Sequence, residues 1–270
     1  MAEPTIDDKK MPLLEHLVEL RRRLIYSFIA FILAFLVCYH FSQDIFAFLV
    51  RPLAAALKDT QNAHMIFTAL HEAFFTYLKV AFWAAAFVSF PVIASQIWMF
   101  VAPGLYRHER RAFLPFLVAT PVLFLLGAAL VYYVIFPMAW QFFLSFQTPS
   151  GGDGALPIEV APKVDQYLSL SMQLIFAFGL GFELPVLLML LVRVGIVSSA
   201  GLARNRRYAI VGAFIAAAVL TPPDVLSQFS LAIPLIILYE ISVIGGRLIE
   251  KSRAAREAAE AAQEANDAVT

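Results

Sequence analysis

Long apolar runs separated by short polar segments dominate this chain. A helix needs about 20 apolar residues to cross roughly 30 Å of hydrocarbon, and four runs come close to or meet that requirement, at residues 24–41, 74–101, 112–136 and 167–192. Two more runs, 208–220 and 225–245, are joined by TPPD, whose prolines and aspartate predict a tight hairpin. The pattern predicts an all-α polytopic membrane protein with six transmembrane helices, of which the last two are short.

The segments between and after these runs predict the remaining organisation. The loop at 42–73 contains DIFAFLV, which is too short to span the membrane and predicts an interfacial or capping helix. Residues 251–270 are rich in Ala, Glu and Arg. They predict a solvated helical or frayed tail outside a membrane domain of residues 1–250.

Prolines lie inside or at the ends of most runs. Each proline removes one backbone hydrogen bond and bends its helix, so repeated prolines favour a bundle curved into a concave shape. The alternative is the ordinary abundance of proline in membrane helices. The residues concerned are Pro91, Pro115, Pro121, Pro137, Pro185 and Pro234.

Composition and charge support the membrane assignment. Hydrophobic residues make up 61% of the chain and charged residues 15%, which exceeds the apolar content of a soluble core. With six spans, 16 of the 20 Lys and Arg residues lie on the side that holds both termini, which predicts that both termini are cytoplasmic. The single cysteine, Cys38, excludes an internal disulfide and is predicted to be a small core residue.

The segment at about 11–23 predicts an amphipathic helix that lies on the cytoplasmic surface before the chain turns into the membrane. Leucines line one face of this helix, and Glu19 lies on the other face among arginines. Arg21 breaks the pattern because it falls on the apolar side. It must therefore reach lipid headgroups or a protein partner.

Two acids near the predicted cytoplasmic face have competing explanations. Glu19 has the i,i+4 spacing for a surface ion pair with Arg23, worth about 0.3–0.5 kcal/mol. Glu109 is the one acid in the basic loop APGLYRHERRAF, and topology gives no reason for it. Two carboxylates kept ionised by basic surroundings suit bidentate capture of guanidinium groups. The functional alternative is thus a ligand that carries adjacent arginines.

Glu183 lies ten residues, or roughly 15 Å, from Arg193 and so near the bilayer midplane. A charged carboxyl is costly there, so we expect it to face the bundle interior or a water-filled groove, protonated or hydrogen-bonded to a partner helix. The alternative is a neutral structural acid capped by neighbours such as Gln173. Asp224 is expected to cap the last helix, and Glu240 to form an ion pair or reach the interface.

Several catalytic classes are excluded by missing motifs. The sequence has no nucleotide-binding P-loop, no zinc-binding helix and no Ser-His-Asp arrangement. It predicts neither an enzyme nor a cofactor, so the energy for any transport must come from elsewhere. A proton-coupled small-solute transporter that uses Glu183 is the alternative function, and a pure scaffold is another.

Five stretches together resemble the TatC family, a subunit of the twin-arginine protein translocase. They are HLVELRRRL at 16–24, APGLYRHERR at 102–111, FGLGFELPV at 178–186, LTPPDVLSQ at 220–228 and LAIP at 231–234. The resemblance covers the membrane part of the chain and leaves out the tail beyond about Lys251.

This resemblance implies a receptor in the bacterial cytoplasmic membrane that exports folded proteins, driven by the protonmotive force. It implies that Glu19 and Glu109 bind the paired arginines of signal peptides, with Arg21 in the same N-terminal motif and Phe100 at a nearby aromatic position. It also implies that Glu183 faces a concave groove and contacts partner subunits.

The resemblance further implies that Pro52 and Asp224 occupy outer-face positions needed for activity. The implied partners are the single-span TatA and TatB type subunits, twin-arginine signal peptides, membrane lipid and other copies of the chain.

Overall fold

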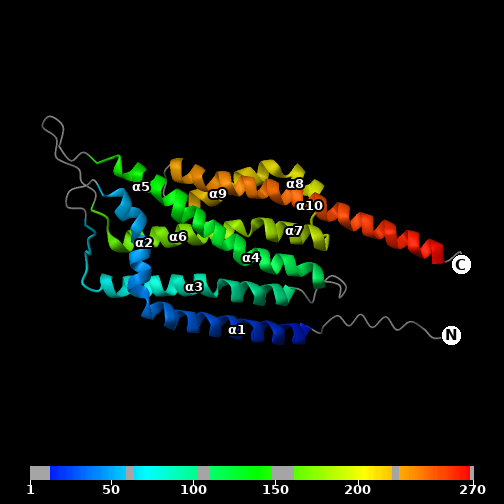
Figure 1. The fold of residues 1–270 in the computed structure, drawn as a ribbon, viewed down its shortest axis with the longest axis horizontal. Helices are drawn as coiled ribbons and strands as arrows, with labels where there is room; N and C mark the ends of the chain where they lie inside the picture. Colours follow the sequence, from blue (N-terminus) through cyan, green and yellow to red (C-terminus); the bar gives the residue numbers. More distant parts are fainter. Residues whose placement is uncertain (1–12, 59–63, 102–109, 148–160, 221–224, 268–270) are drawn as a thin grey trace.

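The structure, a computed structural model, describes residues 13–58, 64–101, 110–147, 161–220 and 225–267 of the 270-residue chain (Figure 1). Its regular elements are helices, and a single β-bridge joins Ile66 to Lys163. The elements are α1 (Leu13–His40), α2 (Ser42–Ala56), α3 (Glu72–Val101), α4 (Arg110–Leu130), the π-helix η3 (Val131–Ile135), α5 (Phe136–Leu144), α6 (Val164–Phe182), α7 (Leu184–Val194), α8 (Ser199–Arg204), α9 (Arg206–Leu220) and α10 (Val225–Asp267).

The predicted all-α membrane class is confirmed. Five segments of the described chain are long and apolar enough to cross a membrane: His16–His40, Glu72–Phe100, Pro115–Leu144, Val164–Val194 and Gln228–Ala255. The remaining predicted span, 208–220, lies in α9, whose 15 residues correspond to about 22 Å of helix. The count of six spans stays a prediction.

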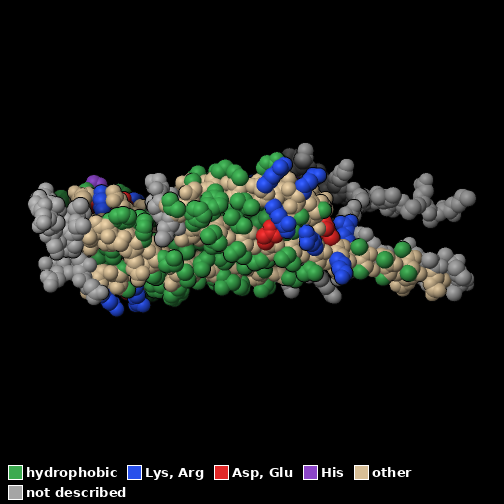
Figure 2. Space-filling model, turned by 90° about the horizontal axis from the view of Figure 1, so that it is seen from above, with side chains coloured by type: hydrophobic (Ala, Val, Ile, Leu, Met, Phe, Trp, Pro, Cys, Tyr) green, Lys and Arg blue, Asp and Glu red, His purple; other side chains and the backbone are tan. Residues whose placement is uncertain are grey.

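Charged side chains gather away from the middle of the molecule. Hydrophobic side chains cover the middle, whereas Lys and Arg lie mainly near the end from which α10 projects (Figure 2). The first residues of α1 and the last residues of α10 lie at this same end (Figure 1). The predicted placement of both termini on one side of the membrane agrees with this arrangement.

The predicted capping helix in the first long loop is α2. It lies across one end of the bundle (Figure 1) and packs on α5 and α3. Its buried residues Leu49, Pro52 and Leu53 face these helices. With only 15 residues, α2 covers the ends of the long helices rather than running beside them.

The predicted surface helix at 11–23 is wrong as a separate element. The chain forms one helix from Leu13 to His40, and α1 shows no turn between a surface part and a membrane part (Figure 1). Residues 13–40 contain neither proline nor glycine, so nothing in the backbone ends the helix at the membrane edge.

The prediction of a short last helix ending at residue 245 is also wrong. α10 continues over 43 residues from Val225 to Asp267 and projects beyond the bundle (Figure 1). After Gly246 no proline or glycine follows, and Ala, Glu and Arg are strong helix formers. The tail from residue 251 is therefore helical as far as Asp267.

Side-chain contacts hold the short helix α8 against α10. The Glu250 carboxylate accepts hydrogen bonds from the Ser199 backbone N–H, at 2.8 Å, and from the Ser199 hydroxyl. The Tyr239 hydroxyl donates to the Leu202 carbonyl at 2.8 Å. At the start of α9, Arg206 pairs with Glu240 at 2.7 Å, which confirms the expected ion pair of Glu240.

The core between α4 and α6 depends on two glycines. A Cβ at Gly127 would lie 2.6 Å from the Phe178 carbonyl oxygen, and a Cβ at Gly179 would lie 2.5 Å from the Phe124 ring. Phe124 and Phe178 are themselves buried. The two helices therefore approach closely because these side chains are missing. Cys38 is buried, as predicted.

Substituting Gly127→Ala is expected to lower the free energy of unfolding by roughly 1–3 kcal/mol, because the obstructing atom belongs to backbone that cannot move aside. Denaturant unfolding in detergent measures this change. The matched control is Gly212→Ala, where a Cβ meets no atom within 4 Å. Equal stability of the two variants would show that the α4–α6 approach has room for a methyl group.

Candidate functional site

The carboxylate of Glu19 is held at the joint end of α1 and α3. Its Oε1 atom accepts a hydrogen bond from Arg23 at 3.1 Å, and 12% of the Glu19 side chain is exposed. This is the i,i+4 ion pair that the spacing predicts. Arg23 also donates to the Gln96 side-chain oxygen at 3.2 Å and contacts the Met99 sulfur at 3.5 Å. Arg23 therefore has acceptors on α3 besides Glu19.

An aromatic stack joins the same two helices one turn away. The rings of His16 and Phe100 lie parallel, with centroids 4.3 Å apart and an interplanar angle of 21°. His16 and Glu19 are three residues apart and share a face of α1. Phe100 is the penultimate residue of α3. The stack therefore places the end of α3 close to the part of α1 that carries Glu19.

The other predicted members of this site are placed differently. Arg21 is exposed on α1, so it is available to headgroups or to a partner, as expected for a residue that breaks the helix pattern. Glu109 lies outside the described residues. By sequence it directly precedes α4, which begins at Arg110.

The intramembrane acid Glu183 lies at a break between two helices. α6 ends at Phe182 and α7 begins at Leu184. Pro185 explains the break, since it has no N–H to donate to the preceding turn. The predicted single run at 167–192 is therefore two helices that meet at the acid.

The Glu183 carboxyl meets polar groups from two other helices. The Thr120 hydroxyl of α4 lies close to it, and the Trp98 indole N–H of α3 donates to that hydroxyl at 3.0 Å. The Oε1 atom of Glu183 is buried without a hydrogen-bond partner among the described residues. Gln173, expected as a possible cap, instead donates to the Leu220 carbonyl at 3.2 Å.

At the opposite end of the bundle, Pro52 leaves a carbonyl of α2 without its helical partner. The carbonyl of Phe48, four residues earlier, would normally accept from the N–H at position 52, which proline lacks. The Tyr132 hydroxyl donates to this carbonyl at 2.8 Å. The Tyr167 hydroxyl donates to the next carbonyl, that of Leu49, at 2.7 Å. Two tyrosines thus fix α2 on the bundle.

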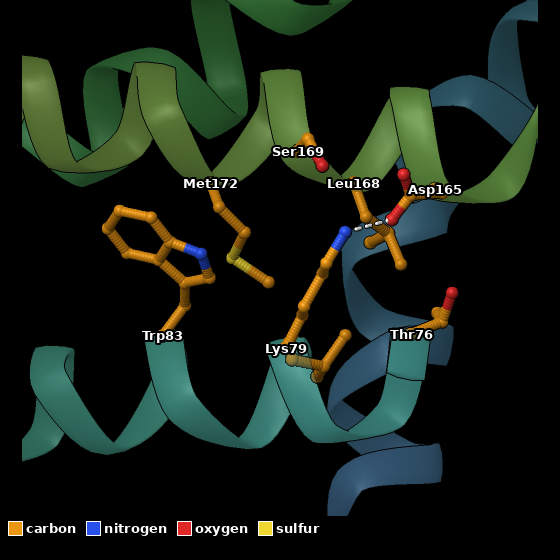
Figure 3. A pocket seen from close by; sticks show the side chains of 8 residues that line it. Thr76, Lys79, Trp83, Asp165, Leu168, Ser169 and Met172 are labelled. Carbon is orange, nitrogen blue, oxygen red and sulfur yellow. Dashed lines mark hydrogen bonds and ion pairs between the residues drawn. The ribbon is translucent and has the colours of Figure 1, made fainter. Parts of the chain in front are cut away.

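Ion pairs join α3 to α6 at this end. Lys79 and Asp165 both line a small cavity, and the Lys79 ammonium nitrogen lies 2.5 Å from an Asp165 carboxylate oxygen (Figure 3). Nearby, Glu72 accepts from the Thr68 backbone N–H at 2.8 Å and lies 3.9 Å from the Lys163 ammonium. These pairs tie the beginnings of two long helices together. Asp224 lies outside the described residues, directly before α10.

Known proteins match this chain along most of its length. The sequence profile of the family described as "Sec-independent protein translocase protein (TatC)" matches residues 15–234. The chain belongs to the TatC family.

Curated TatC proteins and solved TatC structures agree with this membership. The "Sec-independent protein translocase protein TatC" of Magnetococcus marinus is 54% identical over 260 residues, which cover 96% of this chain and 93% of that protein. The protein of the same name from Escherichia coli K12 is 43% identical over 236 residues, which cover 87% and 88%. A "Crystal Structure of Twin Arginine Translocase Receptor- TatC" matches with a TM-score of 0.73 and 36% identity, covering 87% of this chain and 99% of that one.

As a TatC protein, the chain is a core subunit of the Sec-independent, twin-arginine protein translocase. Its apolar helices make it a multi-pass membrane protein. Membership in a protein-transport family favours this function over a small-solute transporter. The described residues contain no group of three or more His, Cys, Asp or Glu side chains that could hold a metal ion.

Sequence reasoning missed the neighbours that surround each candidate residue. His16, Gln96 and Trp98 carry no motif of their own, because helical periodicity gives the face of a residue but not its partner on another helix. Pro52 did carry a signal. A proline inside a helix predicts a free carbonyl four residues earlier, although not that Tyr132 would be its donor.

Replacing Tyr132→Phe is expected to lower the free energy of unfolding by about 0.5–1.5 kcal/mol, because the Phe48 carbonyl loses its donor. In a Pro52→Ala background the loss should shrink, since alanine restores a backbone N–H at position 52. Thermal unfolding of the single and double variants measures the coupling. Tyr133→Phe is the matched control, because Tyr133 is 69% exposed. Additive effects would contradict the assigned role of Tyr132.

Proposed function

We propose that this TatC protein is the receptor that binds twin-arginine signal peptides at the joint end of α1 and α3. The supporting observation is the cluster of Glu19, Arg23, Gln96 and Phe100, which two helices hold together. A carboxylate beside an aromatic ring at a membrane edge suits a peptide that carries arginines next to an apolar segment.

Arg23 explains how the Glu19 carboxylate can have a partner and still be free to accept a ligand. One oxygen of the carboxylate accepts a hydrogen bond from Arg23, and Arg23 also donates to the side-chain oxygen of Gln96. A ligand guanidinium can therefore take the carboxylate while Arg23 stays bound to α3. The planar fork of arginine fits two carboxylate oxygens, whereas the lysine ammonium is a point charge. This geometry favours an arginine pair over a lysine pair.

Glu109 is proposed as the second acid of this site. Phe100, whose ring stacks on His16, is the penultimate residue of α3. Nine residues, 101–109, separate Phe100 from the start of α4 at Arg110, and Glu109 is the last of them. Arg21, which is exposed on α1, is proposed to contact lipid headgroups or the cargo.

A second proposed function belongs to Glu183, which would contact the single-span TatA and TatB type subunits. Its buried Oε1 atom has no partner among the described residues, and a polar group from a neighbouring helix would satisfy it. The Thr120 hydroxyl, which accepts from the Trp98 indole N–H, lies close to the same carboxyl. We further propose that the protonmotive force drives transport.

The proposed setting is the bacterial cytoplasmic membrane, with both termini in the cytoplasm and self-association of several copies. The concentration of basic residues at the end from which α10 projects supports this orientation (Figure 2). The α2 end then faces outward. There, Pro52 leaves the Phe48 carbonyl of α2 free to accept from the Tyr132 hydroxyl. Asp224 is proposed to be needed for activity on the same face. The tail at 251–270 is proposed to be separate from the membrane domain in function.

Glu19→Gln and Glu109→Gln are each expected to weaken binding of a twin-arginine signal peptide at least about tenfold, since each removes a charge-assisted hydrogen bond. The Lys-Lys version of the peptide should bind weakly to the wild type and should not respond to either substitution. Photocrosslinking of the two peptides to the protein in membranes measures both effects.

Two variants serve as controls for this experiment. Glu240→Gln removes a carboxylate at the same end of the bundle but outside the cluster, and should bind like the wild type. Arg23→Gln keeps both acids and should retain the preference for arginine. Equal binding of both peptides, with no effect of either acid, would make Glu19 a structural ion pair.

Glu183→Ala is expected to leave signal-peptide binding unchanged while reducing co-purification of TatA and TatB type subunits and transport. The reason is that the Glu183 carboxyl lies at the α6–α7 junction, whereas the proposed peptide site is made of side chains of α1 and α3. Gln173→Ala is the matched control, because it removes a polar group of α6 that already has a partner. Loss of peptide binding in Glu183→Ala would refute separate roles for the two sites.

A further inference from the structure

An apolar groove of about 370 Å³ lies between α3 on one wall and α4, η3 and α6 on the other. Trp83 and Phe87 line the first wall, Leu125 and Ala129 the second, and Phe48 of α2 lies at one end. None of these side chains carries a charge. The groove plays no part in either site proposed above.

The groove opens sideways from the bundle. Three of its lining residues are largely exposed: Val88 at 60%, Leu125 at 52% and Tyr133 at 69%. All three belong to segments long and apolar enough to cross the membrane. The opening therefore faces hydrocarbon rather than water, and an apolar groove in that position is filled by apolar groups.

The positively charged side chain of Arg51 lies at the α2 end of this groove. The Phe48 ring stacks on Tyr132 with centroids 4.3 Å apart, and the Arg51 guanidinium carbon lies 5.9 Å from the Phe48 centroid. The Tyr132 hydroxyl is used by the Phe48 carbonyl. Within the described chain, no carboxylate forms an ion pair with the exposed Arg51 side chain. An apolar channel thus ends at an exposed guanidinium.

We propose that this groove binds one phospholipid, with an acyl chain between α3 and α4 and the phosphate on Arg51. A guanidinium is the cationic group that best matches a phosphate, through two parallel hydrogen bonds. Arg51 lies on the capping helix at the end of the bundle, which is where the headgroup of a lipid in that leaflet lies. In the proposed orientation this is the outer leaflet.

The chemistry of the groove favours an acyl chain. Its lining side chains are uncharged, and a guanidinium lies at one end, which matches an apolar chain that carries a charged headgroup. A flexible, unbranched chain can follow such a groove, and Arg51 supplies the charge that selects its headgroup.

The first test counts the phospholipid retained per protein by native mass spectrometry, after purification in detergent and addition of phosphatidylglycerol. The wild type is expected to retain one molecule. Arg51→Gln should weaken retention about tenfold, because a charge-assisted hydrogen bond to phosphate is lost. Lys58→Gln, which removes an exposed charge just beyond α2, should retain lipid like the wild type.

The second test places the acyl chain. In a protein with Trp98→Phe and Trp140→Phe, Trp83 is the one remaining tryptophan of three. In vesicles of phosphatidylglycerol with dibrominated acyl chains, the fluorescence of Trp83 should be quenched. Adding Ala129→Phe, which fills the groove, should remove most of that quenching. Should this variant not fold, Ala84→Leu fills the groove from the other wall.

Equal retention by Arg51→Gln and the wild type would overturn the headgroup assignment, and unchanged quenching in the filled variants would overturn the acyl assignment. A groove-filling variant that lowers signal-peptide crosslinking without changing lipid retention would identify a peptide as the occupant and would also overturn the proposal. Neither lipid measurement uses a signal peptide, so failure here is distinct from failure of the receptor function.

Discussion

Backbone groups inside hydrocarbon must find partners within the protein, and this requirement organises the whole structure. It is met trivially inside a continuous helix and becomes demanding wherever a helix ends or contains a proline. In this chain, side chains from neighbouring helices supply the missing donors at such places. Tyr132 reaches a carbonyl of α2, and Gln173 reaches the last carbonyl of α9. Gln228 of α10 also donates to a carbonyl within α9, that of Phe214, at 3.3 Å. The interruptions are therefore also the points where helices are fastened to one another.

The two candidate sites follow the same logic with charged groups. Glu19 and Arg23 satisfy each other where α1 and α3 reach the membrane edge, with Gln96 as a third partner. Glu183 lies at the α6–α7 break, where Thr120 covers only part of its polar surface. A fully satisfied group fixes a structure, whereas a partly satisfied group leaves capacity for a ligand. By this measure Glu183 has capacity for a further partner, whereas the Lys79–Asp165 pair that joins α3 to α6 is structural.

The sequence was sufficient for the helical class and for the spans of α3, α4 and α6, because long apolar runs have few alternatives in a membrane. It failed at α1 and α10, where polar residues flank an apolar run. There, hydropathy changes at the membrane edge, but the helix continues because no glycine or proline ends it. The family motifs pointed to Glu19, Glu183 and Pro52, and the structure added their neighbours. Contacts such as His16 with Phe100 join residues more than 80 positions apart, and one sequence carries no record of such pairing.

The break at Glu183 has a mechanical consequence. α6 packs mainly on α4, whereas α7 packs mainly on α10, and α10 is tied to α8 through Glu250. The α6–α7 segment therefore joins one group of helices around α4 to another around α10, with Glu183 at the junction. A force applied to the projecting end of α10 would reach this junction through α7, which packs on α10. The Glu183 carboxyl lies there, and its buried Oε1 atom has no hydrogen-bond partner within the described chain.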